Sequence, residues 1–142
     1  MDCNRIADLP EVALAEMNAV HQEEMRLLRE FIATLEACDH GHESRDALDP
    51  LLGALLDHLQ AHFRGEEARM EAAAFPPYAV HKAEHDRVLA EARAVAEAWL
   101  RFRDYDTLRR YFCEMLPRWM FDHVATMDRV TAAYLAEREG LE

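Results

Sequence analysis

Prolines and short polar runs divide this sequence into four long stretches whose apolar residues recur at helical spacing. Steps of three, four, seven or eight residues place those side chains on one face of a helix, because an α-helix turns once every 3.6 residues. The expected helices run from Pro10 to about Cys38, from Pro50 to about Met70, from Tyr78 or Ala79 to about Phe102, and from a junction at Asp104–Thr107 to about Glu139. The pattern predicts an all-α protein.

The ends of these stretches carry residues that start or stop helices. Pro10 and Pro50 suit a first turn, where the missing N–H would be unpaired anyway, and Asp49 fits the N-cap before Pro50. The run Phe75-Pro76-Pro77 ends the second stretch. Pro117 lies inside the last stretch, where it removes a hydrogen-bond donor and crowds the carbonyl four residues earlier. We therefore expect the last helix to be kinked or broken near Pro117.

Four helices with short connections most simply form an antiparallel up-down four-helix bundle. The chain has 142 residues and shows no internal repeat or linker, so we expect residues 1–142 to form a single domain. Only four glycines and five prolines accompany 51% hydrophobic and 31% charged residues. This composition leaves little room for a turn-rich β protein or for a disordered chain.

Charge and cysteine usage narrow the partners and the compartment. A net charge of −12 argues against nucleic acid and anionic membranes, which attract clustered Lys and Arg. No apolar run approaches the roughly 18 residues of a membrane span, and the first ten residues lack the apolar core of a secretion signal. The three cysteines are odd in number and widely spaced, as suits a reducing compartment. We expect a cytoplasmic protein.

Five of the eight histidines lie on the expected inward faces of the helices. His62 and Glu66 are four residues apart, and His81 and His85 repeat that spacing on the next stretch. Each pair therefore shares one side of its helix, one turn apart. With members from the first and last stretches, the candidate metal ligands are His21, His62, Glu66, His81, His85, His123 and Asp128.

The donor set indicates a site for two metal ions. Neutral imidazole suits iron, copper, zinc and nickel, while carboxylates can bridge two cations. Seven donors exceed the four of a tetrahedral zinc site. One spacing fits poorly, because Asp128 follows His123 by five residues, about 140° around an ideal helix. Either Asp128 reaches across, or a local π-type widening of the helix redirects it.

The segments that hold these residues resemble the hemerythrin-like HHE cation-binding family, the bacteriohemerythrins included. The matching segments are Met17–Glu24, His62–Met70, Tyr78–Asp86 and Trp119–Asp128, which touch every expected helix. They carry the elements H-x3-E, H-x3-H and H-x4-D in this order, and the last is the family's own spacing. The resemblance implies a four-helix bundle with a non-haem di-iron site that binds dioxygen reversibly.

Carried over residue by residue, the resemblance places three histidines on one iron and two on the other, with two carboxylates and an oxo or hydroxo group as bridges. These are His81, His85 and His123 for the first iron, His21 and His62 for the second, and Glu66 and Asp128 for the bridge. The second iron keeps an open position for dioxygen or a similar diatomic molecule. Such a protein would store, deliver or sense oxygen and need not be an enzyme.

Two further residues near the expected site keep other functions open. His58 lies one turn before His62, where family members often carry Tyr, and we expect it to hydrogen-bond beside the site. Glu24 is expected to face water or to hydrogen-bond nearby. As a proton donor, His58 would favour a di-iron redox enzyme acting on peroxide or nitric oxide. A sensor of iron, oxygen or redox state is a further alternative.

The dipeptide His85-Asp86 is the one feature that points to an unrelated metal enzyme, an HD-type phosphohydrolase. That interpretation leaves the other ligand pairs, His62–Glu66 and His123–Asp128, without a role. We therefore favour the oxygen-binding di-iron protein.

Overall fold

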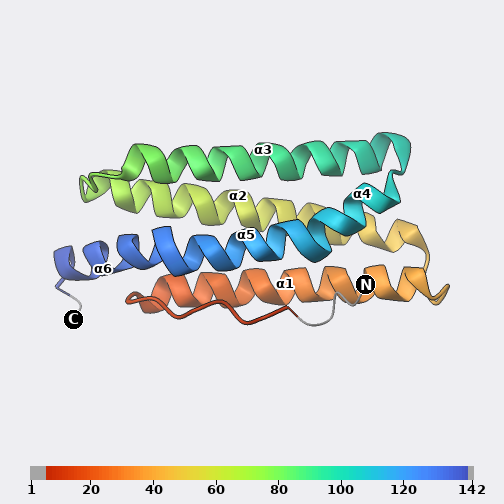
Figure 1. Cartoon of the computed structure of the whole chain (residues 1–142), viewed down its shortest axis with the longest axis horizontal. Coiled ribbons are helices and arrows are strands. Elements are labelled where there is room, and N and C mark those ends of the chain that lie inside the picture. Colours follow the sequence, from red (N-terminus) through yellow and green to blue (C-terminus); the bar gives the residue numbers. More distant parts are fainter. Residues whose placement is uncertain (1–5, 141–142) are drawn as a thin grey trace.

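The structure, a computed structural model, describes residues 6–140, and their elements form an antiparallel four-helix bundle (Figure 1). Three bundle helices are unbroken: α1 (Ala15–Asp39), α2 (Leu48–Ala72) and α3 (Tyr78–Phe102). The fourth consists of α4 (Tyr105–Arg110), α5 (Leu116–His123) and α6 (Arg129–Arg138), joined by π-helical turns at Tyr111–Met115 and Val124–Asp128. No strand occurs among the described residues. The predicted fold class is confirmed.

Apolar side chains form two separate clusters along the bundle. The larger cluster fills the half that holds the C-terminal part of α1, with Leu28, Phe31 and Trp99 at most 1% exposed. The smaller cluster lies at the opposite end and contains Leu14, Met17, Ala132, Leu135 and Ala136. Along α1 and along the fourth helix, the buried residues between the two clusters are polar, with the exception of Val124. The fold therefore places a polar interior between two apolar ends.

The prediction that Pro10 begins the first helix is wrong. Residues 6–14 are not helical, and Figure 1 shows them running back along α1, which begins at Ala15. The side-chain amide of Asn18 accepts from the Val12 N–H at 2.8 Å and donates to the Val12 carbonyl at 2.9 Å. These two bonds hold the segment in a non-helical conformation. Leu14 is nevertheless buried, so its apolar spacing correctly indicated a core position.

The start of α2 also differs from the prediction. A 3₁₀ turn at Arg45–Ala47 precedes the helix, and Ser44 caps that turn by accepting from the Asp46 N–H. Asp49 is therefore not an N-cap, although Pro50 does lie in the first turn. The carboxylate of Asp49 instead accepts from the indole N–H of Trp99 at 2.8 Å. A tertiary contact thus replaces the local role that the sequence predicted.

The expected disturbance near Pro117 takes the form of a π-helical turn. Pro117 lies at the start of α5, directly after the turn at Tyr111–Met115, and Figure 1 shows α4 inclined to α5. The wider turn accommodates a proline that has no N–H for the helical ladder. Among residues 6–140, none of the helices combines the length and the hydropathy that a membrane span requires. The predictions for the first five residues, Cys3 among them, lie outside the described part of the chain.

Candidate metal centre

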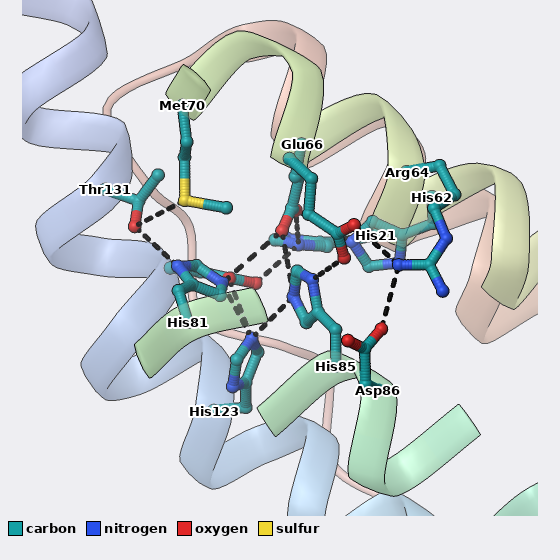
Figure 2. A network of polar contacts seen from close by, with 12 residues as sticks. His21, His62, Arg64, Glu66, Met70, His81, His85, Asp86, His123 and Thr131 are labelled. Atoms are coloured by element: carbon teal, nitrogen blue, oxygen red, sulfur yellow. Dashed lines mark hydrogen bonds and ion pairs between the residues drawn. The ribbon is translucent and has the colours of Figure 1, made fainter. Parts of the chain in front are cut away.

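The structure brings all seven predicted donor residues together in the polar interior, and all are buried. The donors that Figure 2 labels point toward one another. Their donor atoms form two overlapping groups in which all atoms lie within 4.8 Å of one another. The five-donor group comprises Glu66, His81, His85, His123 and Asp128, and the four-donor group comprises His21, His62, Glu66 and Asp128. Glu66 and Asp128 belong to both groups.

Three imidazoles converge in the five-donor group. The Nε2 atom of His123 lies 3.1 Å from Nε2 of His81 and 3.2 Å from Nε2 of His85. Two ring nitrogens that both lack a proton repel each other at this distance unless a cation lies between them. Metal–nitrogen bonds of about 2.1 Å place adjacent octahedral donors about 3.0 Å apart and tetrahedral donors about 3.4 Å apart. The observed separations fit adjacent octahedral positions better.

Each shared carboxylate presents one oxygen to each group. Asp128 Oδ1 lies 3.1 Å from Nε2 of both His81 and His123, whereas Oδ2 lies 3.0 Å from Nε2 of His21. Glu66 Oε2 lies 2.8 Å from Nε2 of His62, and Oε1 lies 3.4 Å from Nε2 of His85. This division of oxygens is the arrangement of carboxylates that bridge two cations.

Several buried donor atoms have no hydrogen-bond partner among the described residues. They are both ring nitrogens of His21, Oε1 of Glu66 and both carboxylate oxygens of Asp128. An unpaired buried polar atom costs roughly 1–3 kcal/mol, and native interiors contain few of them. Four of these atoms, all except Nδ1 of His21, face other donors of the two groups, which indicates that cations would complete the site. The residues present therefore fit a pair of bound metal ions.

Three of the histidines are oriented by hydrogen bonds from their outer ring nitrogens. Nδ1 of His62 contacts Glu24 at 2.9 Å, Nδ1 of His85 contacts Glu67 at 2.9 Å, and Nδ1 of His81 contacts Thr131 at 2.8 Å. Each contact keeps the ring proton on Nδ1, so Nε2 presents its lone pair to the centre.

Glu67 and Thr131 were not found by reasoning from the sequence. Glu67 adjoins Glu66 in a charged run that is typical of a solvated face, yet it is 4% exposed. Thr131 follows Asp128 by three residues on the same face of the helix, which was the available signal. The Thr131 hydroxyl also lies 3.9 Å from the sulfur of Met70.

Aromatic rings shield the centre on the side of the larger apolar cluster. Phe63 stacks on His85 with ring centroids 4.1 Å apart and planes within 6°. Trp119 stacks on His123 at 4.4 Å, and its indole N–H donates to Glu84 at 2.7 Å. These contacts fix the rings and exclude water from that side of the donors.

Glu24 and His58 form an outer pair beside His62. Glu24 is 1% exposed and accepts from Nδ1 of both His58, at 3.2 Å, and His62. The expectation that Glu24 hydrogen-bonds nearby is confirmed, whereas exposure to water is wrong. His58 is partly exposed, and its polar contact is with Glu24 instead of a member of either donor group. His40 and His42 are exposed.

The unfavourable spacing of Asp128 is explained by a π-helical turn. Residues Val124–Asp128 have the i→i+5 hydrogen-bond pattern, which brings a residue five positions onward near the face of the first. Asp128 thereby joins the face of His123. Of the two explanations that the sequence left open, local widening of the helix is the one observed.

The charges in the centre stabilise one another when metal is not bound. Burial alone would lower the pKa of His21, but the neighbouring carboxylates of Asp128 and Glu66 raise it to about 9. Burial would raise the pKa of Glu24, but the charges and hydrogen bonds of His62 and His58 lower it to about 2. The pKa of Asp128 is well below its usual value, because the adjacent imidazoles of His123, His21 and His81 outweigh burial. In the metal-free protein, protons on the imidazoles then balance the negative charge of the carboxylates, as metal cations would.

These shifts predict opposite pH responses for metal-free and metal-loaded protein. The raised pKa of His21 contributes stability that is present below pH 6.5 and lost as pH rises through about 9. The lowered pKa of Glu24 contributes stability that is present above pH 4.5 and lost as pH falls through about 2. The Tm of metal-free protein should therefore be highest between pH 4.5 and 6.5.

Metal loading requires neutral imidazoles, so protons compete with the metal ions. The Tm difference between loaded and metal-free protein should therefore grow from about pH 5 to about pH 8. Thermal scans of both forms at several pH values measure it. A metal-free Tm that rises from pH 6.5 to 9 would contradict the assigned charges.

Comparisons with known proteins agree with this geometry. Residues 12–135 match the family model described as the hemerythrin HHE cation binding domain. A bacteriohemerythrin of Aquifex aeolicus is 34% identical over 121 residues, covering 85% of this chain and 88% of the relative. A bacteriohemerythrin of Ralstonia nicotianae is 44% identical over 88 residues, which is 61% of this chain and 62% of that relative. No solved structure gives a significant match.

The family model and the seven converging donor residues point to the same class of protein. This chain belongs to the hemerythrin HHE cation-binding family, and its hemerythrin-type domain holds a buried cluster of histidines and carboxylates.

Proposed function

We propose that the protein holds two iron ions and binds dioxygen reversibly. The observation that carries this proposal is the sharing of Glu66 and Asp128 by two donor groups, with one oxygen of each carboxylate on either side. One ion would be held by His81, His85 and His123 together with the two carboxylates. The other would be held by His21 and His62 with the same carboxylates.

The two groups differ by one donor, and this difference supports binding of a small molecule at the four-donor group. Bound iron supplies electrons that can pass reversibly to dioxygen. The chain holds the donors in place, orients the imidazoles through Glu24, Glu67 and Thr131, and excludes water with Phe63 and Trp119. The relatives named bacteriohemerythrin favour the same assignment.

Metal analysis together with an optical spectrum tests this proposal. Protein produced in iron-replete medium should contain two irons per chain, with no more than traces of zinc. Its spectrum should change on reduction, change again on exposure to air, and return when oxygen is removed. One zinc ion and no iron, or a spectrum that does not respond to oxygen, would overturn the proposal.

The alternative function, reduction of peroxide or nitric oxide, depended on His58 as a proton donor. The polar contact of His58 is with Glu24, which also accepts from Nδ1 of His62. We find no observation that favours the enzyme over the oxygen-binding protein.

Replacing His58 with Phe is expected to leave both metal ions in place. The substitution keeps a ring of similar bulk and removes one of the two hydrogen bonds to Glu24, while the bond from His62 remains. Loss of a group that hydrogen-bonds directly to a metal ligand costs about 10–100-fold. His58 hydrogen-bonds to Glu24 and not to a ligand, so the dissociation constant for oxygen should change by less than about tenfold. Metal content and oxygen titration measure the result. Loss of one metal ion would instead identify His58 as a ligand.

A further inference from the structure

A narrow crevice between α1 and α2 reaches the four-donor group. Its volume is about 180 Å³, and its lining includes the buried donors His62 and Glu66. Met17, Val20 and Leu135 contribute apolar walls, and the exposed Gly65 lies at the solvent side. Glu66 is 5% exposed, and its Oε2 faces His62 of the four-donor group. The crevice therefore connects solvent with two donors of that group.

Two other cavities approach the centre, but neither combines apolar walls with access to the four-donor group. A groove of about 790 Å³ reaches His81, which belongs to the five-donor group. A cavity of about 340 Å³ beneath residues 6–14 reaches His21, but Asp8, Glu11 and Gln22 make it polar. Only the α1–α2 crevice among these three combines apolar walls with access to the group that has fewer donors.

Gly65 lines the crevice in the middle of α2. A glycine in the middle of a helix costs about 0.5–1 kcal/mol relative to alanine, and its φ is not in the left-handed region that favours glycine. A Cβ atom at position 65 would meet nothing within 4 Å. Neither backbone strain nor close packing therefore requires glycine there. Ala61, one turn earlier, is a second small residue that lines the crevice.

Arg69 closes the crevice at one end. Its guanidinium lies 3.1 Å from Glu16 of α1 and 2.7 Å from Glu139, directly after α6. These ion pairs tie α2 to both neighbours one turn beyond Gly65. Gly65 and Ala61 line the crevice within the two turns that precede Arg69.

We propose that small apolar molecules of the size of dioxygen reach the four-donor side through this crevice, which Gly65 lines at its solvent side. The proposal rests on the function proposed above. Apolar walls favour a neutral diatomic molecule over an anion or a bulky substrate. A larger side chain at position 65 would narrow the passage and leave the donors unchanged.

Substitutions at Gly65 test the route by kinetics. Gly65→Leu should slow oxygen association at least tenfold and Gly65→Val less, whereas Gly65→Ala should leave it nearly unchanged, because a Cβ atom there meets nothing within 4 Å. Dissociation should slow by the same factor, so the equilibrium constant stays within twofold. Gly53→Leu is the matched control, because Gly53 also lies on α2 and a Cβ atom there would meet nothing within 4 Å. Stopped-flow mixing measures both rates.

A second measurement does not require bound iron. Dissolved oxygen is paramagnetic and shortens the relaxation times of nearby methyl protons in the full-length, metal-free chain. The methyl groups of Met17, Val20 and Leu135 should show this effect in wild type and Gly53→Leu, and lose it in Gly65→Leu. If the protein does not bind iron or oxygen but this relaxation pattern appears, the proposed function is wrong and the proposed entry route is still supported.

Three results would overturn the proposed route. Wild-type oxygen kinetics in Gly65→Leu would show that the crevice is not used. Equal relaxation effects in wild type and Gly65→Leu would show that oxygen does not enter there. Slower association in Ala133→Leu, which narrows the groove beside His81, together with unchanged rates in Gly65→Leu, would assign entry to the five-donor side.

Discussion

Replacing Asp128 with alanine is expected to abolish the binding of two metal ions. Asp128 is fully buried, and its oxygens lie 3.0–3.1 Å from the Nε2 atoms of His21, His81 and His123. Both donor groups lose a member at once, because each carboxylate oxygen serves one group. We expect at most one metal ion per chain, bound at least 100-fold more weakly, as measured by metal analysis and calorimetric titration. The magnitude follows from the loss of a direct ligand, whose effect exceeds the 10–100-fold effect of outer contacts.

The same substitution should destabilise the metal-free protein at low pH. At pH 6, protonated His21 would remain buried without its main carboxylate partner, and breaking a buried ion pair costs roughly 3–5 kcal/mol. Asp122→Ala is the matched control, since Asp122 is exposed and its side chain belongs to neither donor group. Two metal ions retained at wild-type affinity in Asp128→Ala would refute the shared carboxylate.

The fold followed from the sequence wherever helix ends are set by local chemistry. The third helix begins at Tyr78 as predicted, because two prolines precede it, and it ends at Phe102 as predicted. The start of α1 was misplaced because Leu14 continues the apolar spacing without being helical. Spacing reports which side chains are buried, whereas the backbone of residues 6–14 is set by Asn18 bonding back to Val12.

The candidate site divides along the same line. Its seven donors were predictable because pairs such as His81 and His85 share one face of a single helix. The outer contacts of Glu67 and Thr131 depend on which helices lie side by side. The residue pattern of a single helix does not contain that information. The π turn at Asp128 is an intermediate case. The sequence showed that the five-residue spacing from His123 does not fit an ideal α-helix, but it did not show the cause.

The two apolar clusters explain how a small bundle tolerates this polar interior. Side chains such as Phe31 and Leu35 on one side, and Leu135 on the other, are at most 1% exposed and stabilise the bundle at both ends of the site. The donors between them are unsatisfied without cations, so stability and metal binding are coupled. Chelation should therefore weaken the middle of the bundle more than its ends.

Glu24→Ala and Glu67→Ala are expected to weaken opposite sides of the centre. Glu24 orients His62 of the four-donor group, whereas Glu67 orients His85 of the five-donor group, each through an Nδ1 contact of 2.9 Å. Loss of such an outer contact lowers metal affinity by about 10–100-fold. Titration with iron should therefore show one weakened site in each variant, and the two variants should differ in which histidine shifts on binding, as followed by NMR of the imidazole nitrogens.

Conservative variants distinguish orientation of the ring from general packing. Glu67→Gln keeps an oxygen that can accept from His85, so it should recover most of the affinity lost in Glu67→Ala. Arg64→Ala removes the other partner of Glu67, at 2.5 Å, without touching His85, and should change affinity by less than about threefold, the size expected of a partly exposed ion pair. If Glu24→Ala and Glu67→Ala weaken both sites equally, the outer carboxylates act on the stability of the whole bundle. If instead each variant loses affinity only at the metal site of its own histidine, each carboxylate holds its own imidazole in place.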